Sequence, residues 1–421
     1  MSFPTNSAEF DARVRRYAAL LIRVAVNLQR GQRLTIWKAP VNAAPFVRSL
    51  TEEAYEAGAA YVDVFWQDDR LELIRLTHTR PDTYADRPAW EVEVMESSAQ
   101  DGGAFLFFDC TCAGVFDNTP AAVVSRAIAL ENEHLQRVWQ FFVRNTVNWS
   151  IATVPTESWA RKVYPTLEPA DGIRRLWEAI FTTCRVDTED YEARWYRHRK
   201  ALEQRSDALN RLSLTELRFT APGTDLTVGL PPHHTWQHPG FYTTQGLPFI
   251  ADIPIEEIFT VPDRDRVDGV VRSTRPLVVN GQTLSEFTVR LERGRIVEIT
   301  GDDRAQRLLT HLLENNDGAD RLGEVAIVPE DSLVAMQGHS FYNTIFDENS
   351  SCHLALGRAY RFCMAGGKEM DDTAFVAAGG NVSPVHVDFM IGSREMSVTG
   401  VTMDGTVVSI LEAGQWVLDR D

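Results

Sequence analysis

Apolar segments of strand length alternate with amphipathic segments of helix length through the first half of the chain. The apolar segments occupy residues 34–39, 60–66, 104–110 and 147–155. The segments with helical spacing occupy residues 42–58, 87–100 and 119–145. Strands that alternate with helices of this length are typical of an open, mainly parallel α/β sheet. Two further helical segments, 172–184 and 191–212, predict a connector to a second domain.

The second half of the chain has a different pattern, in which polar and apolar residues alternate with period two. Residues 214–222 and 224–230 follow this pattern, and residues 399–411 form the clearest predicted hairpin. Turn signals recur at Asn280-Gly281, Arg293-Gly294 and Asp404-Gly405. The pattern predicts a mostly antiparallel, β-rich sheet.

Helical spacing is rare in this second half. It occurs only at residues 304–316 and around residues 353–362. We therefore expect an α/β domain with its helical connector at 1–212, and a β-rich (α+β) domain at 213–421.

Composition narrows the class of protein and its partners. The 421-residue chain has a formal net charge of −17, which disfavours nucleic acid and anionic membrane surfaces as partners. No segment approaches the about 18 apolar residues that a membrane helix needs. The first 21 residues predict a helix and not an export signal, and the five cysteines form no disulfide framework. We therefore expect the protein to reside in the reducing cytoplasm.

Ionisable side chains stand beside apolar strands at four places in the second half. They are Glu256 with Glu257, Glu324, His353 with Tyr360, and His386 with Asp388. Residues two apart on a strand face the same side, so His386 and Asp388 can converge on one ion. His353 and Tyr360 are seven residues apart and would share one face of a helix.

Each of these features alone is more often a surface-facing side chain or a core histidine held by a carboxylate. A lone glutamate in an apolar strand is nevertheless costly to bury unless it is paired or metal-bound. Mixed carboxylate and imidazole donors suit zinc, cobalt, manganese or ferrous iron better than calcium or magnesium. As a set, the residues therefore predict a transition-metal site in the β-rich domain.

Several long motifs around these residues resemble one known family. They include EEIFTVP (256–262), RLGEVAIVP (321–329), FYNTIFDENSSCHLALGRAY (341–360) and VHVDFMIGSREM (385–396). The chain resembles the metallo-aminopeptidases of the thermophilic aminopeptidase T and staphylococcal aminopeptidase S type. The motifs occur in the same order, and the resemblance covers essentially the whole chain.

The resemblance implies a dinuclear metal site that releases the amino-terminal residue from short peptides, with apolar residues such as Leu preferred. Carried over by position, the family's ligands fall on Glu257, Glu324, His353, Tyr360, His386 and Asp388. The family alignment favours Glu257 over Glu256, although a different placement of one gap before Glu324 would exchange the pair. Adjacent strand residues face opposite sides, so only one of the two meets the metal from a regular strand. A strand end or a bulge would allow both to reach the site, and Glu256 is then the candidate general base.

Two further implications concern Tyr360 and the assembly. Tyr360 is a ligand in the family, and it could equally donate to the oxyanion that develops during hydrolysis. The resemblance implies two divalent ions, with zinc, cobalt and manganese as candidates. It also implies a homodimer.

The chain departs from the family at several positions. Asp252 and Ile255 stand where the family usually has Asn and Thr, and Asp252 could favour a cationic amino terminus or simply face solvent. His233, His234 and His238 lie in a region that usually carries no histidine cluster, and a solvated loop is favoured over an extra metal ligand. These differences bear on substrate preference more than on the metal core.

The cysteines predict no chemistry of their own. Cys110 and Cys112 are separated by one residue and are expected to be small core or rim residues, not a redox pair. Cys352 is expected to pack in a helix beside His353, where it would not act as a nucleophile.

Three functions remain to be compared. The first is a dinuclear metallo-aminopeptidase. The second is a mononuclear Fe(II) ring-cleaving dioxygenase, which needs only His353, His386 and Asp388. The third is a binding or scaffold protein that has lost catalysis. The presence of the two glutamates and of Tyr360 favours the hydrolase, because six ligands serve two ions.

Overall fold

The chain forms two compact units. A computed structural model describes residues 7–80, 83, 86–110 and 114–418. The amino-terminal unit comprises Met1–His198, Pro239–Ile255 and Asn280–Gln282, and the carboxy-terminal unit comprises Arg199–His238, Glu256–Val279 and Thr283–Asp421. The domain boundary that the sequence places at residue 212 stays a prediction.

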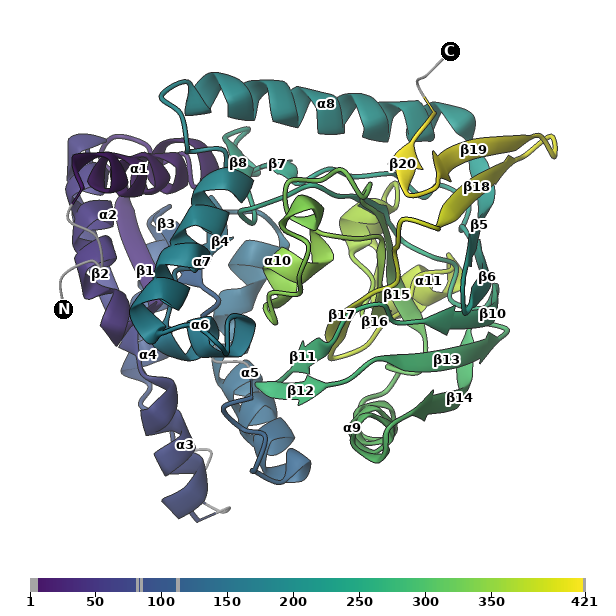
Figure 1. Cartoon of the computed structure of the whole chain (residues 1–421), viewed down its shortest axis with the longest axis horizontal. Helices are drawn as coiled ribbons and strands as arrows, with labels where there is room; N and C mark the ends of the chain where they lie inside the picture. Colours follow the sequence, from purple (N-terminus) through teal and green to yellow (C-terminus); the bar gives the residue numbers. More distant parts are fainter. Residues whose placement is uncertain (1–6, 81–82, 84–85, 111–113, 419–421) are drawn as a thin grey trace. The chain divides into compact units, whose positions relative to one another are not determined.

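The amino-terminal unit is built on a four-stranded parallel sheet (Figure 1). Its strands are β1 (Arg33–Pro40), β2 (Tyr61–Gln67), β3 (Ala104–Phe108) and β4 (Trp149–Ala152), in the order β2-β1-β3-β4. Every neighbouring pair runs parallel. Parallel neighbours need crossover connections, which the helices between the strands supply. The predicted α/β sheet is confirmed.

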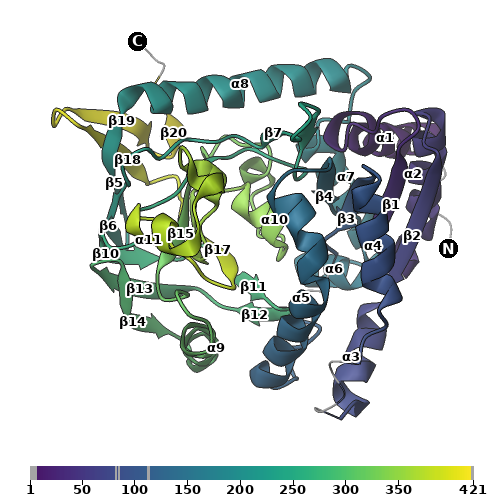
Figure 2. The same ribbon diagram turned by 180° about the vertical axis from the view of Figure 1, so that it is seen from behind.

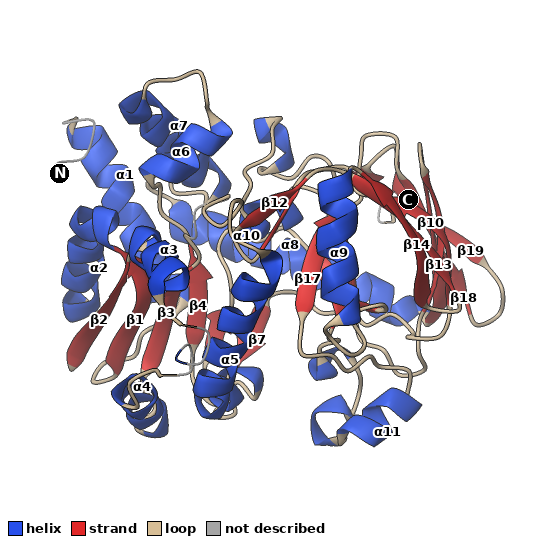
Figure 3. Ribbon diagram, turned by 90° about the horizontal axis from the view of Figure 1, so that it is seen from below, coloured by secondary structure: helices blue, strands red, loops and turns tan. Residues whose placement is uncertain are grey.

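Helices cover both faces of this sheet (Figure 3). Phe105 and Phe107 are two apart on β3 and pack with Phe142 of α5 (Ala121–Val143) and with α4 (Trp90–Gln100). The next residue, Phe108, points to the opposite face and meets Phe46 of α2 (Ala44–Glu56). Phe46 also contacts α1 (Ala8–Ala19) and α7 (Pro169–Thr183) through aromatic rings. A strand buried on both faces explains the continuous apolar run in the sequence.

The carboxy-terminal unit contains an eight-stranded antiparallel sheet (Figure 2). Its strand order is β14-β13-β10-β6-β5-β18-β19-β20. The strands are β5 (Leu214–Ala221), β6 (Thr224–Gly229), β10 (Val267–Arg272), β13 (Phe287–Glu292), β14 (Arg295–Gly301), β18 (Ser397–Thr402), β19 (Val407–Glu412) and β20 (Gln415–Trp416). The predicted antiparallel texture of this half is confirmed.

The turn between β13 and β14 shows how local chemistry makes this sheet. Arg293 and Gly294 both have positive φ, at 47° and 76°, as a two-residue hairpin turn requires. A Cβ on Gly294 would lie 1.8 Å from the carbonyl oxygen of Arg264, so only glycine fits there. The predicted turn signal at this pair is therefore confirmed.

A second, four-stranded antiparallel sheet lies in the same unit and carries four of the six predicted ligands, Glu324, His353, His386 and Asp388. Its order is β17-β16-β15-β9, and each neighbouring pair is antiparallel. The strands are β9 (Ile258–Thr260), β15 (Leu322–Ile327), β16 (His353–Gly357) and β17 (His386–Met390). Every residue of β9, β15 and β16 is buried.

The helix expected around residues 353–362 is wrong. Residues His353–Gly357 form strand β16, paired with β15 on one side and β17 on the other. Leu, Ala and Arg favour helices locally, but two neighbouring strands satisfy the backbone of this segment from both sides. Tertiary pairing therefore overrides local propensity.

The remaining elements complete the two units. The helices are α3 (Asp69–His78), α6 (Glu157–Val163), α8 (Tyr191–Leu212), α9 (Asp303–Glu314), α10 (Thr344–Glu348) and α11 (Asp372–Ala377). Short strands are β7 (Gly240–Tyr242), β8 (Pro248–Ile250), β11 (Leu277–Val279) and β12 (Gln282–Leu284). Helix α9 confirms the prediction for residues 304–316. Among the described residues, no helix combines the length and apolar character needed to cross a membrane.

Candidate metal centre

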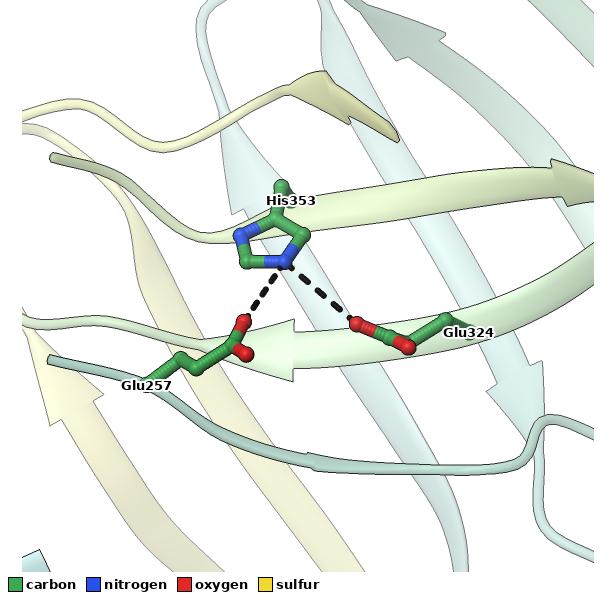
Figure 4. Close-up of side chains that lie close together, drawn as sticks. All are labelled: Glu257, Glu324 and His353. Atoms are coloured by element: carbon green, nitrogen blue, oxygen red, sulfur yellow. Dashed lines mark ion pairs between the residues drawn. The ribbon is translucent and has the colours of Figure 1, made fainter. Parts of the chain in front are cut away.

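Three predicted ligands converge from neighbouring segments of the four-stranded sheet (Figure 4). Glu257 immediately precedes β9, Glu324 lies in β15, and His353 begins β16. The Nε2 atom of His353 is 2.9 Å from Glu257 Oε2 and 3.5 Å from Glu324 Oε1. All three side chains are at most 10% exposed. We call them the first donor group.

A second donor group forms around the other side of Glu324. His386 and Asp388 are two residues apart on β17 and face the same side, as their spacing predicts. His386 Nε2 is 3.3 Å from Asp388 Oδ1 and 3.7 Å from Glu324 Oε2. Donor atoms of these three residues all lie within 4.8 Å of one another.

Glu324 belongs to both groups. Its Oε1 atom faces His353 and its Oε2 atom faces His386. A carboxylate that presents one oxygen to each of two groups can bridge two cations. The arrangement therefore consists of two adjacent groups of candidate metal donors that share one carboxylate.

Two buried carboxylate oxygens test whether these side chains fit a cation. Glu257 Oε2 faces His353 Nε2 and Asp388 Oδ1 faces His386 Nε2, and neither oxygen accepts a hydrogen bond of good geometry within the described residues. Buried oxygens that lack such a bond are costly, and a divalent cation would satisfy both of them. The donor set of carboxylates and imidazoles fits zinc, cobalt or manganese.

Main-chain carbonyls orient both imidazole rings. His353 Nδ1 is 3.2 Å from the carbonyl oxygen of Ser351, and His386 Nδ1 is 2.7 Å from that of Arg358. A carbonyl only accepts hydrogen bonds, so each Nδ1 carries the proton and each Nε2 is left to bind a cation. These partners had no signal in the sequence, because every residue has a carbonyl.

The buried donor side chains shift one another's pKa values. Burial, together with the charges of Glu257 and Asp388, raises the pKa of Glu324 to about 7. Burial opposes protonation of His386, but Asp388 and Glu324 outweigh it and raise its pKa to about 9. Burial favours protonation of Asp388, yet His386 holds the pKa of that carboxyl below its ordinary value. Protons thus provide positive charge that divalent cations would otherwise supply.

Tyr360 lies three residues beyond β16, in a loop and not on a helix. Its ring centroid is 4.6 Å from that of His386, and it stacks on Phe362 at 5.1 Å. Burial, and then the carboxylates of Glu324 and Asp388, raise its pKa well above the ordinary value. The predicted residue is therefore beside the second donor group, although the helical reason for expecting it there is wrong.

The two adjacent glutamates have different surroundings. Both are buried, at 6% exposure for Glu256 and 7% for Glu257, and both precede the regular part of β9. Glu257 reaches the first donor group, whereas Glu256 belongs to neither group of candidate donors among the described residues. The backbone N–H of Glu256 donates to Asn349 Oδ1 over 2.7 Å.

The histidine-rich loop is only partly the solvated loop that was expected. His233 is exposed, but His234 and His238 are half-buried, and burial lowers the pKa of each. His234 Nδ1 is 2.9 Å from the carbonyl oxygen of Pro231. None of the three joins a group of candidate metal donors in the described parts of the chain. Asp252 lies in the amino-terminal unit, where it forms an isolated bridge with Ile151.

The cysteines are placed as follows. Cys352 directly precedes β16, so its predicted helical setting is wrong. Its thiol lies 3.4 Å from the carbonyl oxygen of Val328, and burial raises its pKa to about 12, which makes it a packing residue. Cys110 is half-buried and contacts Val154, whereas Cys112 lies outside the described residues.

With this geometry in place, comparison with known proteins decides the family. Residues 10–416 match the family described as thermophilic metalloprotease (M29). The chain belongs to this family. It is 39% identical to aminopeptidase T of Thermus thermophilus over 97% of this chain and 99% of that protein. It is 37% identical to aminopeptidase AmpS of Bacillus subtilis, again over 97% and 99%.

Solved structures support the same assignment. Wild-type AmpT from Thermus thermophilus superimposes with a TM-score of 0.90 at 38% identity, covering 97% of this chain and 100% of that one. A 2,5-dihydroxypyridine dioxygenase from Pseudomonas putida reaches a TM-score of 0.50 at 13% identity over 98% of each chain, a likeness of fold alone. The enzyme class expected from the sequence, a metal-dependent aminopeptidase, is thereby confirmed. Membership of a metalloprotease family also implies a divalent metal ion.

Proposed function

We propose that this aminopeptidase works through a dinuclear centre, in which Glu324 would be a ligand that two divalent ions share. The observation that supports the proposal is that each oxygen of Glu324 faces a different histidine. Glu257 and His353 would complete one ion's ligands, and His386 and Asp388 would complete the other's. Tyr360 adds a sixth donor next to His386.

Ions bound there would polarise the scissile carbonyl and lower the pKa of a water molecule. The chain itself must then hold the substrate and move protons. Glu256 is our candidate general base: its carboxylate would accept the proton of the attacking water and deliver it to the leaving amine. Its buried position beside Glu257 supports this role.

Two alternative roles for Tyr360 differ in whether its phenol keeps its proton. As a ligand it would lose the proton, whereas as a donor to the developing oxyanion it would keep it. Burial and two carboxylates favour the protonated phenol while no cation is present. A nearby divalent charge would reverse that preference, so we favour the ligand role.

The physiological substrates that we propose are short peptides with an apolar amino-terminal residue such as Leu. We further expect a homodimer in the cytoplasm, and zinc, cobalt or manganese as the metal. The few scattered cysteines of the chain support a location in the cytoplasm. Its strong negative charge argues against nucleic acid as a partner.

The test is hydrolysis of a leucine chromogenic amide by purified protein, by protein treated with a chelator, and after separate addition of zinc, cobalt and manganese. We expect activity to disappear when the chelator removes the metal. On re-addition, we expect activity to rise as the second ion binds to each chain. Full activity with one ion per chain would contradict the dinuclear centre.

A further inference from the structure

The segment that carries Glu256 and Glu257 lies outside the β-sheet and so has no regular pattern of backbone hydrogen bonds. Both residues precede β9 and lie outside regular secondary structure. A backbone N–H that is buried in such a segment needs a specific partner. Glu256 N–H finds one in the side chain of Asn349, whose Oδ1 lies 2.7 Å away.

The side chain of Asn349 is held so that its acceptor points at this segment. The residue is completely buried, and its Nδ2 donates to the carbonyl oxygen of Ile345 over 2.8 Å. Its own carbonyl oxygen accepts from Ser332 Oγ over 3.0 Å. Because Nδ2 must face a carbonyl, Oδ1 must face the N–H of Glu256, and the amide cannot be flipped without losing both bonds.

The turn that contains Asn349 also supports the other end of the first donor group. Two residues on, the carbonyl of Ser351 accepts from His353 Nδ1. The second donor group relies on a different carbonyl, that of Arg358, for His386. Support for the two groups therefore comes from two separate parts of the chain.

We infer that Asn349 is a positioning residue that tunes the two metal positions unequally. By fixing the backbone beside Glu257, it sets where Glu257 stands in the first donor group. The residues that it bonds, Glu256, Ile345 and Ser332, do not belong to the second donor group. This inference rests on the proposed dinuclear centre.

The experiment is a metal titration of chelator-treated protein by calorimetry, with zinc and with manganese, for wild type, Asn349→Ala and Asn349→Asp. Loss of a residue that supports a ligand typically weakens metal binding about 10–100-fold. We expect Asn349→Ala to weaken one of two binding steps by that factor and to leave the other unchanged. Asn349→Asp keeps an acceptor for Glu256 N–H but loses the donor to Ile345, so it should weaken the same step much less than Asn349→Ala does.

The two substitutions separate positioning from a general structural role. If the bond to Ile345 in α10 were what mattered, Asn349→Asp would fail as badly as Asn349→Ala, and the inference would be overturned. Equal weakening of both steps would overturn it as well. Should Asn349→Ala not fold, Asn349→Asp still decides, because loss of one step in that folded variant contradicts the inference.

Asn148 provides a matched control in the amino-terminal unit. It is also buried, donates to the carbonyl of Val26 over 2.7 Å and accepts from Gln32 over 3.0 Å. Asn148→Ala should leave both metal steps unchanged. A single binding step in wild type would instead contradict the dinuclear centre itself, so the two failures can be told apart.

Discussion

Two buried sheets in this protein use burial in opposite ways. In the amino-terminal unit, Leu34, Ile36 and Phe105 are fully buried on the central strands. Thr35, a buried polar residue of β1, is uncharged, and its hydroxyl lies 3.1 Å from that of Ser98. This sheet is stabilised by removal of apolar surface from water.

The four-stranded sheet of the carboxy-terminal unit is buried just as deeply but contains ionisable groups. Glu324 and His353 are 4% and 1% exposed on strands that are otherwise apolar. Burying such groups costs free energy unless they are paired or bind a cation. The contrast teaches that one sheet serves stability, whereas the other accepts a cost that the proposed metal ions would offset.

Glu324→Gln should break this contrast most severely. The change removes the carboxylate that both donor groups share, so we expect turnover to fall at least about 1000-fold while the fold persists. Steady-state kinetics and metal analysis by mass spectrometry would measure both effects. Glu330→Gln is the control, because Glu330 is also partly buried but joins no donor group among the described residues. An unchanged rate in Glu324→Gln would remove this residue from the site.

His386→Ala should sharpen the contrast by separating the two donor groups. Only the second group loses a donor, so we expect one ion fewer per chain and activity reduced by about 100-fold or more. His234→Ala is the matched control, since His234 is half-buried and bonded to a main-chain carbonyl. Full metal occupancy in His386→Ala would defeat the assignment.

The pH dependence of stability should also distinguish the metal-loaded from the chelated protein. The folded-state pKa values of Glu324 and His386, about 7 and about 9, are raised. Each therefore stabilises the fold below its unfolded-state pKa, and this contribution is lost as pH rises through the folded-state value. Asp388, whose pKa is lowered, stabilises the fold above its unfolded-state pKa, and this contribution is lost only in acid, as pH falls through the lowered folded-state value.

Between about pH 5 and pH 9 the chelated protein should thus lose stability as pH rises. Metal binding should strengthen over the same range, because cations must displace these protons. Thermal unfolding with and without zinc would show a gap that widens with pH. A gap that stays constant would refute the coupling.

Thr35→Val should have the smallest effect and should confine it to stability. Loss of the bond to Ser98 in an apolar sheet should lower the free energy of unfolding by about 1–2 kcal/mol. Denaturant titration would measure this, and metal content should remain that of the wild type. A loss of bound metal would show that the two sheets do not divide stability and chemistry between them.

Much of this protein could be predicted from residue pattern. Alternating strands and helices predicted the parallel sheet, because crossover helices must cover its faces. Period-two segments with turn pairs such as Arg293-Gly294 predicted the antiparallel sheet. The two-residue spacing of His386 and Asp388 predicted that they share a face, which they do on β17.

Strand β16 marks where local pattern failed. Its residues favour a helix when considered alone, and the expectation for Tyr360 and Cys352 depended on that helix. Hydrogen bonds from β15 and β17 decide otherwise, and they come from residues about 30 positions away in either direction. No local spacing carries that information.

The sequence by itself determined which donors exist, in what order, and in which half of the chain. The tertiary structure decided how they are shared. Only antiparallel pairing places Glu324 between His353 and His386, and only the turn before β16 brings Asn349 to the backbone of Glu256. The physical reason is that residue type sets what a side chain can bind, whereas strand register sets which atoms meet.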